Sequence, residues 1–182
     1  MKNSSLKDLI IKKIETEGAI TFADFMEMAL YYPELGYYTK KREPAAIPDY
    51  YTSCELHPVF GQAMANQISR TADFIKNRKF TVLEIGSGKG ILAKDILKHL
   101  KMENEDLYSR LEFIVIERNE RLLIDVGNAL AEHGEKVMLA SGLKKLEGNG
   151  IEGCVISNEL IDSFPVHRIR KEKGELKEIY VS

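Results

Sequence analysis

A glycine-rich segment near the middle of the chain combines residue types and spacing that could hold a ligand against the protein backbone. The segment begins at the end of the β-rich run Phe80–Ile85 and continues beyond it. Its acidic, polar and glycine residues are Glu84, Gly86, Ser87, Gly88 and Gly90. Because glycine lacks a Cβ atom and accepts positive φ, a ligand can approach the main chain closely. The next β-rich run, Phe113–Ile116, is followed by Glu117, where nucleotide-binding α/β proteins place a carboxylate for ribose hydroxyls. Together the two features predict a site for a ligand that carries a ribose.

Two common phosphate-binding motifs do not fit this segment. The dinucleotide fingerprint G-x-G-x-x-G requires glycine at position 91, which holds Ile91. A Walker loop requires glycine at position 83 and Ser or Thr at position 90, which hold Leu83 and Gly90. Glu117 also lies farther from the first glycine than the roughly 20 residues of the compact fingerprint, so we interpret Lys101–Arg110 as an insertion. The alternative is that the glycines merely join a strand to a helix and that Glu117 is solvated.

The elements that must position this segment alternate between β and α from Phe80 onward. Four β-rich runs are expected, at Phe80–Ile85, Phe113–Ile116, Val137–Leu139 and Cys154–Ser157. Helical periodicity separates the first three, with apolar faces that contain Leu92, Ile96, Leu100, Leu122, Leu123, Val126 and Leu130. This order predicts a parallel, doubly wound (Rossmann-like) α/β sheet with helices on both faces. A hairpin is expected from Val166–Lys171 and Leu176–Val181, which flank a short polar turn.

The residues before the sheet are expected to form helices and a loop. Two helices should begin at the capping boxes Ser5-x-x-Asp8 and Thr21-x-x-Asp24. Gly18 and Pro33 are expected to end them. Residues 37–54 gather tyrosines, prolines and basic residues, which is typical of an exposed loop. We therefore divide the chain into an N-terminal helical segment with a loop that covers the cofactor, residues 1–78, and a Rossmann-like core, residues 79–182.

Composition and charge exclude several classes of function. Apolar residues make up 44% and charged residues 30% of the chain, which is globular usage and excludes a disordered or collagen-like chain. The net charge of −2 lacks the basic excess of nucleic-acid-binding proteins. The longest apolar run, Met28–Tyr32, is far shorter than the roughly 20 residues that span a bilayer, and the first residues do not resemble a signal peptide. We therefore predict a cytoplasmic protein without a membrane or nucleic-acid partner. Because the two Cys and four His residues are scattered, no metal site is predicted.

The glycine segment resembles motif I of class I S-adenosylmethionine-dependent methyltransferases, and other segments narrow the resemblance to one family. Residues 20–38, 49–53 and 59–61 are similar to the N-terminal signature of the MidA-like methyltransferases. Residues 157–168, which begin Ser157-Asn158-Glu159, are similar to the motif that follows the fourth strand in the same family. The matches run in the same order along nearly the whole chain. The chain departs from the family pattern at Pro48, Cys54 and His57.

This resemblance implies an S-adenosylmethionine-dependent methyltransferase. Because the mitochondrial members of the family are protein arginine methyltransferases, the resemblance implies that the methyl acceptor is an arginine of a protein, such as a respiratory-complex subunit. The implied cofactor residues are Glu84, Gly86, Ser87, Gly88, Gly90 and Glu117, with Thr52 and Ser53 as a lid. Arginine stays charged because its pKa is about 12.5 or above, so carboxylates must orient its guanidinium.

The candidate catalytic residues follow the fourth expected strand. We assign Glu159 to the acceptor guanidinium and Asn158 to the cofactor or the acceptor, and we include Asp162 in the catalytic set. Open α/β sheets place their sites at the carboxyl ends of the strands, which is where these residues are expected. The alternative is that Asn158 and Glu159 cap a following helix, and that Thr52 and Ser53 belong to a plain polar loop.

Members of this family are considerably longer than this chain, so the resemblance implies an N-terminal part or a truncated product. It implies a sheet that is incomplete at its C-terminal end, with an exposed edge and uncovered apolar surface that favour self-association. We expect this chain by itself to be inactive, because the remainder should supply part of the acceptor pocket. Two alternatives stay open: a methyltransferase for a small molecule or another protein side chain, and a non-catalytic assembly or binding protein that keeps the fold.

Overall fold

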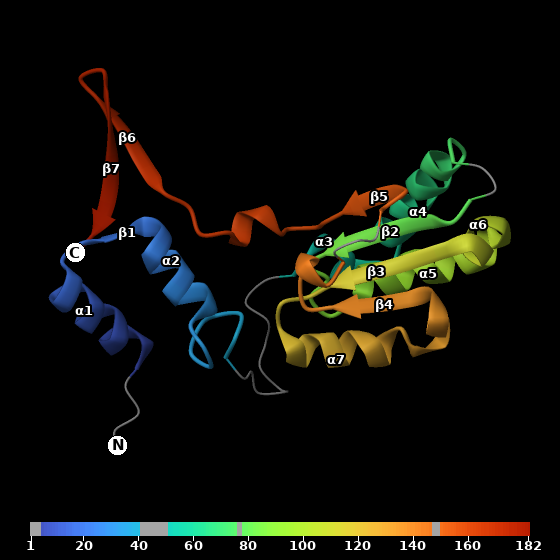
Figure 1. The fold of residues 1–182 in the computed structure, drawn as a ribbon, viewed down its shortest axis with the longest axis horizontal. Coiled ribbons are helices and arrows are strands. Elements are labelled where there is room, and N and C mark those ends of the chain that lie inside the picture. The colour runs from blue at the N-terminus through green and yellow to red at the C-terminus, as the bar shows by residue number, and fades with distance from the viewer. Residues whose placement is uncertain (1–4, 41–50, 76–77, 147–149) are drawn as a thin grey trace. The chain divides into compact units, whose positions relative to one another are not determined.

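The computed structural model describes residues 5–40, 51–75, 78–146 and 150–182 (Figure 1). The chain forms two compact units, one of Pro48–Leu160 and one of Met1–Ile47 with Ile161–Ser182. This grouping differs from the division after residue 78 that the sequence suggested. Residues 41–50 of the predicted loop over residues 37–54, which include Lys41 and Arg42, lie outside the described residues. Within the described ranges, no helix is both long enough and apolar enough to cross a membrane.

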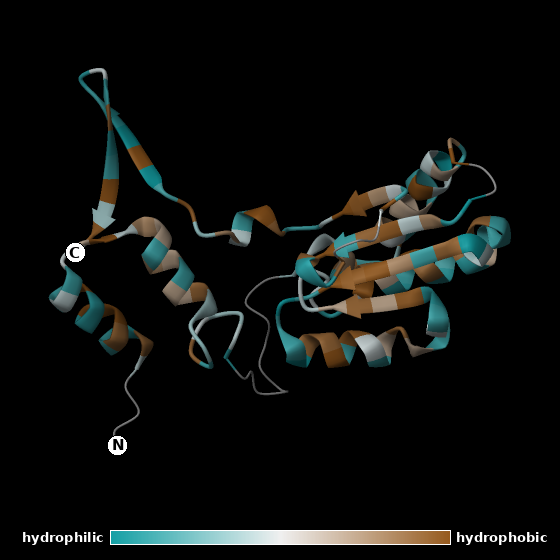
Figure 2. Ribbon diagram, in the orientation of Figure 1, coloured by the Kyte–Doolittle hydropathy of each residue, from teal (hydrophilic) through white to brown (hydrophobic). Residues whose placement is uncertain are grey.

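The larger unit is built on a parallel sheet of four strands. The strands are β2 (Phe80–Ile85), β3 (Leu111–Ile116), β4 (Val137–Ala140) and β5 (Gly153–Ile156). They lie side by side in the order β4-β3-β2-β5 (Figure 1). The strands of this sheet are mainly hydrophobic (Figure 2), as expected for parallel strands that are covered by other elements. The predicted α/β fold with a parallel sheet is confirmed.

The helices of this unit precede the first strand or connect the later ones. They are α3 (Ser53–Leu56), α4 (Val59–Ala72), α5 (Ile91–Glu103), α6 (Glu105–Arg110) and α7 (Glu120–Ala129). Two 3-10 turns, η1 (Ala131–Lys136) and η2 (Leu143–Leu146), flank β4. The segment Lys101–Arg110, which we interpret as an insertion, forms the last turn of α5 and the short helix α6. Helix α6 begins at the cap of Asn104.

The described helices α4, α5 and α7 pack against one face of the sheet. Their buried side chains form one core with the strand residues on that face, among them Phe80, Val82, Phe113, Val115, Ile96, Leu97 and Val126. On the other face, a smaller cluster joins Leu83, Ile114, Ile116 and Ala140 to Leu146 of η2. The prediction of helices on both faces is therefore wrong for the described residues. The described part of the β4–β5 connection contributes the single turn η2 in place of a long helix.

The smaller unit begins with two capped helices. In α1 (Leu6–Glu17) and α2 (Phe22–Tyr31), the capping boxes predicted from Ser5 and Thr21 are both present. Gly18, with φ of 85°, ends α1. Between the helices lies the two-residue strand β1 (Ile20–Thr21).

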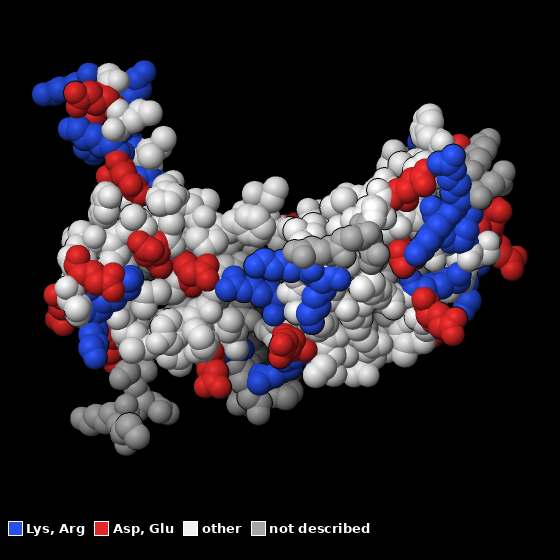
Figure 3. Space-filling view, in the orientation of Figure 1, with Lys and Arg blue, Asp and Glu red and all other residues white. Residues whose placement is uncertain are grey.

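The C-terminal hairpin belongs to the same unit as these helices. It follows the 3-10 turn η3 (Ile161–Ser163) and consists of β6 (Arg168–Glu172) and β7 (Glu175–Val181). Strand β7 pairs antiparallel with both β6 and β1, which gives a three-stranded sheet in the order β1-β7-β6. Basic and acidic side chains are interspersed along the hairpin (Figure 3). The pairing with β1 explains why residues 161–182 group with the N-terminal helices.

Candidate functional site

The glycine loop forms at the carboxyl end of β2, and backbone hydrogen bonds fix it there. Gly86 N–H donates to the carbonyl oxygen of Ile116 at 2.8 Å, and Gly90 N–H donates to that of Ser87 at 2.9 Å. Gly86, Gly88 and Gly90 have φ of 76°, 56° and 73°. These left-handed values favour glycine because a Cβ atom would be strained there. The loop thus turns from β2 directly into α5, for which Gly90 is the N-cap.

Two of the three glycines also lie close to other side chains. A Cβ atom on Gly90 would lie 3.1 Å from Cγ1 of Val126, on α7. A Cβ atom on Gly86 would lie 2.7 Å from Cδ1 of Leu160. At Gly88, by contrast, no atom of the described residues lies within 4 Å of the Cβ position. The described residues therefore leave the backbone at Gly88 open to a ligand on this side.

Glu117 contacts this loop directly. Its Oε2 atom accepts a hydrogen bond from Gly88 N–H at 3.0 Å, and its Oε1 atom accepts one from Asn119 N–H at 2.9 Å. The main-chain N–H of Glu117 donates to the carbonyl oxygen of Ala140 at 3.1 Å, which brings the ends of β3 and β4 together. The structure thus joins the glycine loop and the acidic residue that the sequence had paired. Glu117 is half-buried against the loop and not fully solvated.

Two polar atoms, one in β2 and one in the loop, are buried without a hydrogen-bond partner among the described residues. Glu84 is 2% exposed, and burial raises its pKa to about 8, with a further contribution from the negative charge of Glu117. Among the described residues, its Oε2 atom and Oγ of Ser87 have no hydrogen-bond partner. Buried polar atoms are usually paired, so these two atoms are candidates for contact with a bound ligand.

The residues after β5 reach back to the short helix α3. Oε1 of Glu159 accepts from Ser53 N–H at 3.4 Å and from Nδ2 of Asn158 at 3.5 Å. Glu159 has φ of 49°, in the left-handed region that is uncommon for residues other than glycine. Such strained backbone is often found at functional sites. The structure thus brings together Ser53, proposed for the lid, and Glu159, proposed for the acceptor.

The third candidate catalytic residue belongs to the other compact unit. Asp162 lies in η3, is exposed, and belongs to the smaller unit. The same turn is held within that unit by the hydroxyl of Tyr31, which donates to the carbonyl oxygen of Ser163 at 3.0 Å. The helical element that follows Leu160 is the three-residue 3-10 turn η3.

Sequence reasoning missed three residues near the glycine loop. The Asn119 side chain caps α7 by accepting from the backbone N–H of Arg121, and asparagine before an apolar helical run was a usable signal. Glu55 forms an ion pair with Lys89 of the loop at 2.6 Å. The spacing Thr52-x-x-Glu55 is itself a capping-box pattern, but nothing local in the sequence pairs it with Lys89.

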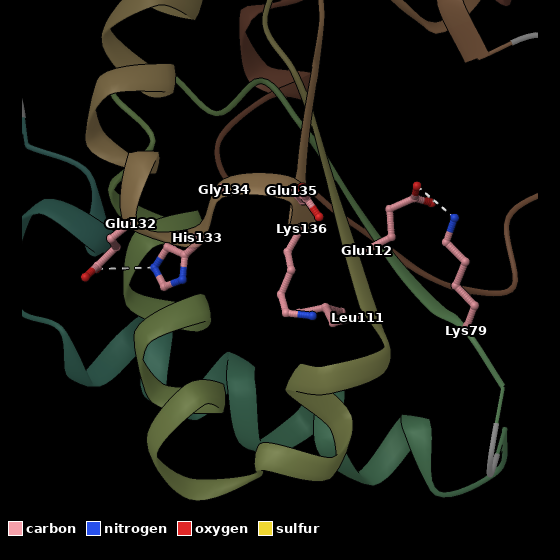
Figure 4. A pocket seen from close by; sticks show the side chains of 8 residues that line it. All are labelled: Lys79, Leu111, Glu112, Glu132, His133, Gly134, Glu135 and Lys136. Carbon is pink, nitrogen blue, oxygen red and sulfur yellow. Dashed lines mark ion pairs between the residues drawn. The ribbon is translucent and has the colours of Figure 1, made fainter.

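One pocket of the larger unit lies away from the glycine loop. It has a volume of about 490 Å³ and is lined at the amino ends of the strands by Leu111 and Lys136, among others. Figure 4 shows the ion pair of Lys79 with Glu112 and the contact of Glu132 with His133 among the residues that line it. Ligands of open α/β sheets bind at the carboxyl ends of the strands, so this pocket is not the candidate site. In the described part of the chain, no group of three or more His, Cys, Asp or Glu residues could hold a metal ion.

The fold and the site define a class of protein. In one class of α/β proteins, a glycine loop and an acidic residue meet at the carboxyl ends of parallel strands and bind a nucleoside-containing ligand there. The sheet of this chain has the same arrangement. The family is identified by sequence: residues 61–182 match a family described as "Putative S-adenosyl-L-methionine-dependent methyltransferase". The match covers more than half of the chain, which therefore belongs to this MidA-like family of methyltransferases.

Curated relatives support the same assignment. The bovine protein named "Protein arginine methyltransferase NDUFAF7, mitochondrial" is 28% identical over an alignment that covers 94% of this chain and 44% of the bovine protein. Its Drosophila melanogaster homolog is 24% identical over 98% of this chain and 45% of its own length. The chain thus spans a little under half the length of the curated relatives it matches.

Solved structures share the fold. A crystal structure of a Burkholderia thailandensis protein bound to S-adenosyl-homocysteine matches 97% of this chain and 46% of its own, with a TM-score of 0.76 and 26% identity. A second structure from the same organism, solved in native form, has a TM-score of 0.75 and 27% identity over 97% of this chain and 44% of its own.

The residues of the glycine loop fit an S-adenosyl ligand. The backbone at Gly88 is open, and the carboxylate of Glu117 lies beside it. Oε2 of Glu84 and Oγ of Ser87, which lack partners among the described residues, add two polar atoms at the same strand end. An acceptor for ribose hydroxyls, an open backbone and buried polar atoms are what such a ligand requires at this edge.

Proposed function

We propose that the protein transfers a methyl group from S-adenosylmethionine to an arginine side chain of another protein. The observation that carries the cofactor half of this proposal is the hydrogen bond from Gly88 N–H to Glu117, which holds a carboxylate beside an open glycine backbone. The arginine half is supported by the relatives named as protein arginine methyltransferases, at 24–28% identity. It is also supported by the carboxylate of Glu159 at the end of β5.

The cofactor would be held mainly by the residues at the ends of β2 and β3. Glu117 would accept hydrogen bonds from the ribose hydroxyls, while Gly86, Gly88 and Gly90 allow the ligand to lie against the main chain. Glu84 and Ser87 would supply the polar atoms that lack partners among the described residues. When bound, S-adenosylmethionine supplies an electrophilic methyl group on a sulfonium.

The acceptor would be oriented by Glu159 and Asn158. Within the described residues, the hydrogen bonds of Glu159 involve Oε1, so its Oε2 atom is available to a guanidinium. A carboxylate binds a guanidinium through charge-assisted hydrogen bonds and fixes its plane. Since methyl transfer requires in-line approach of the acceptor nitrogen, such orientation is the main contribution the protein can make.

The cofactor half is tested by calorimetric titration of the 182-residue chain with S-adenosylhomocysteine, with NAD as the control ligand. We expect saturable binding of the first and none of the second. A folded chain that ignores S-adenosylhomocysteine, or that binds NAD equally, contradicts the proposed cofactor.

The acceptor half is tested with the full-length gene product and S-adenosylmethionine labelled in its methyl group. Peptides that carry a single arginine, lysine or histidine are compared. Label transferred to arginine alone supports the proposal. Transfer only to another side chain or to a small molecule would assign the site to a different acceptor.

A further inference from the structure

The short helix α3 and its cap, Thr52–Leu56, contact the glycine loop through one carboxylate. Oε1 of Glu55 pairs with Nζ of Lys89 at 2.6 Å, and Oε2 accepts from Thr52 N–H at 3.3 Å. Lys89 stands between Gly88 and Gly90 of the loop. The Glu55 side chain is 17% exposed, and its bond to Lys89 lowers its pKa. Glu55 therefore stays charged at neutral pH and links the start of α3 to the loop.

The same segment contacts Glu159 through its main chain. Ser53, the first residue of α3, donates its N–H to Oε1 of Glu159 at 3.4 Å. Glu159 is held at φ of 49°, a conformation that persists only where surrounding contacts determine it. A continuous set of contacts thus runs from Lys89 to Glu55, through Thr52 and Ser53, to Glu159.

We propose that Lys89 and Glu55 are positioning residues, which act through Thr52–Leu56 to hold Ser53 against the carboxylate of Glu159. This inference rests on the proposed function, in which the loop holds the cofactor and Glu159 orients the acceptor. Ligand binding at the glycine loop is then coupled to the orientation of Glu159. Neither Lys89 nor Glu55 needs to touch the ligand or the acceptor for this role.

The expected signature is local, because the ion pair is only partly buried. Lys89 is 64% exposed, and pairs of this kind add little to global stability. Loss of the pair should release Ser53 while the sheet stays folded. Amide exchange reports such local opening, since each N–H exchanges according to the stability of its own segment.

The experiment measures amide exchange of Ser53 by NMR in the ligand-free chain. The test variants are Lys89→Met and Glu55→Gln, and Lys89→Arg is the conservative variant that keeps the charge. Lys144→Met, which removes an exposed lysine from η2, is the matched control. We expect Ser53 to exchange about two- to fivefold faster in the two test variants, and at the wild-type rate in Lys89→Arg and Lys144→Met.

The same variants are then titrated with S-adenosylhomocysteine. We expect Lys89→Met and Glu55→Gln to bind about two- to fivefold more weakly, and the ligand to slow exchange at Ser53 in the wild type. Unchanged exchange at Ser53 in both test variants overturns the inference, even if the wild type binds the ligand. If the wild type does not bind the ligand, the proposed cofactor fails, and the exchange rates still decide whether Lys89 and Glu55 position Ser53.

Discussion

The main-chain N–H of Gly88 donates a hydrogen bond to Oε2 of Glu117 over 3.0 Å, and this contact joins the loop after β2 to the end of β3. The other carboxylate oxygen accepts from Asn119 N–H at 2.9 Å. Because each carboxylate oxygen can accept more than one hydrogen bond, both keep capacity for ribose hydroxyls. Glu117 therefore shapes the loop and, in the proposed function, binds the cofactor.

Replacement of Glu117 should weaken cofactor binding strongly. We expect Glu117→Ala to raise the dissociation constant for S-adenosylhomocysteine by roughly 10- to 100-fold, since a hydrogen bond to a charged group contributes about 1.5–3 kcal/mol. Glu117→Gln, which keeps one acceptor oxygen, should lose less. Calorimetry of both variants measures this, with Glu103→Ala on the exposed end of α5 as the control. An affinity for Glu117→Ala equal to that of the control would remove Glu117 from the site.

Alanine substitutions at the glycines of the loop should lower the free energy of unfolding by different amounts. Gly90→Ala combines a left-handed φ of 73° with contact to Val126, whereas Gly88→Ala has a φ of 56° and open space. We expect Gly88→Ala to lower the free energy of unfolding by about 1–2 kcal/mol from strain alone, and Gly90→Ala to lower it further.

Urea unfolding measures both glycine variants. Gly150→Ala, where the Cβ would meet no described atom within 4 Å, serves as the control and should be neutral or slightly stabilising. Equal losses for Gly90→Ala and Gly88→Ala would mean that the contact with Val126 adds nothing.

Stability should fall as pH rises through the neutral range because of Glu84. Its pKa is about 8 in the folded chain, against 4.5 as the ordinary value. Between these two values the folded state holds a proton that the unfolded state has lost, so the free energy of unfolding decreases with pH, by at most about 1.4 kcal/mol per pH unit. Above pH 8 both states are ionised, and this contribution levels off.

Glu84→Gln keeps the shape of the neutral carboxyl and should lack this pH dependence. The check is urea unfolding at pH 6, 7, 8 and 9 for the wild type, Glu84→Gln and the exposed control Glu103→Gln. The two controls, wild type and Glu103→Gln, should share one slope. An identical slope for Glu84→Gln would show that Glu84 is ionised in the folded chain throughout.

Substitution of Glu159 should separate methyl transfer from cofactor binding. In the full-length gene product we expect Glu159→Gln to lower kcat for an arginine peptide by roughly tenfold or more, since the charge-assisted contact to the guanidinium is lost. Affinity for S-adenosylhomocysteine should change less than twofold. Glu175→Gln, in the exposed hairpin, is the control. Undiminished methylation by Glu159→Gln would exclude the proposed role.

The sequence determined the elements and the chemistry that depend on near neighbours. The capping boxes at Ser5 and Thr21 form as predicted, because their hydrogen bonds join residues three apart. The strand Phe80–Ile85 was predicted with its observed bounds. A short apolar run between a loop and a glycine turn can form few structures other than a buried strand. The glycine spacing was informative for the same reason, since each glycine meets a local backbone requirement.

The tertiary structure decided the contacts between residues that are distant in the chain. Glu55 meets Lys89, and Ser53 meets Glu159, although no local pattern links the members of either pair. Strand β1 pairs with β7, which moves the hairpin from the predicted core to the smaller unit. Helix α7 lies on the same face as α5 because its apolar residues complete one core. Such contacts depend on packing and strand pairing across the whole fold. Packing and pairing are set by the shape and burial of side chains and not by neighbours in the sequence.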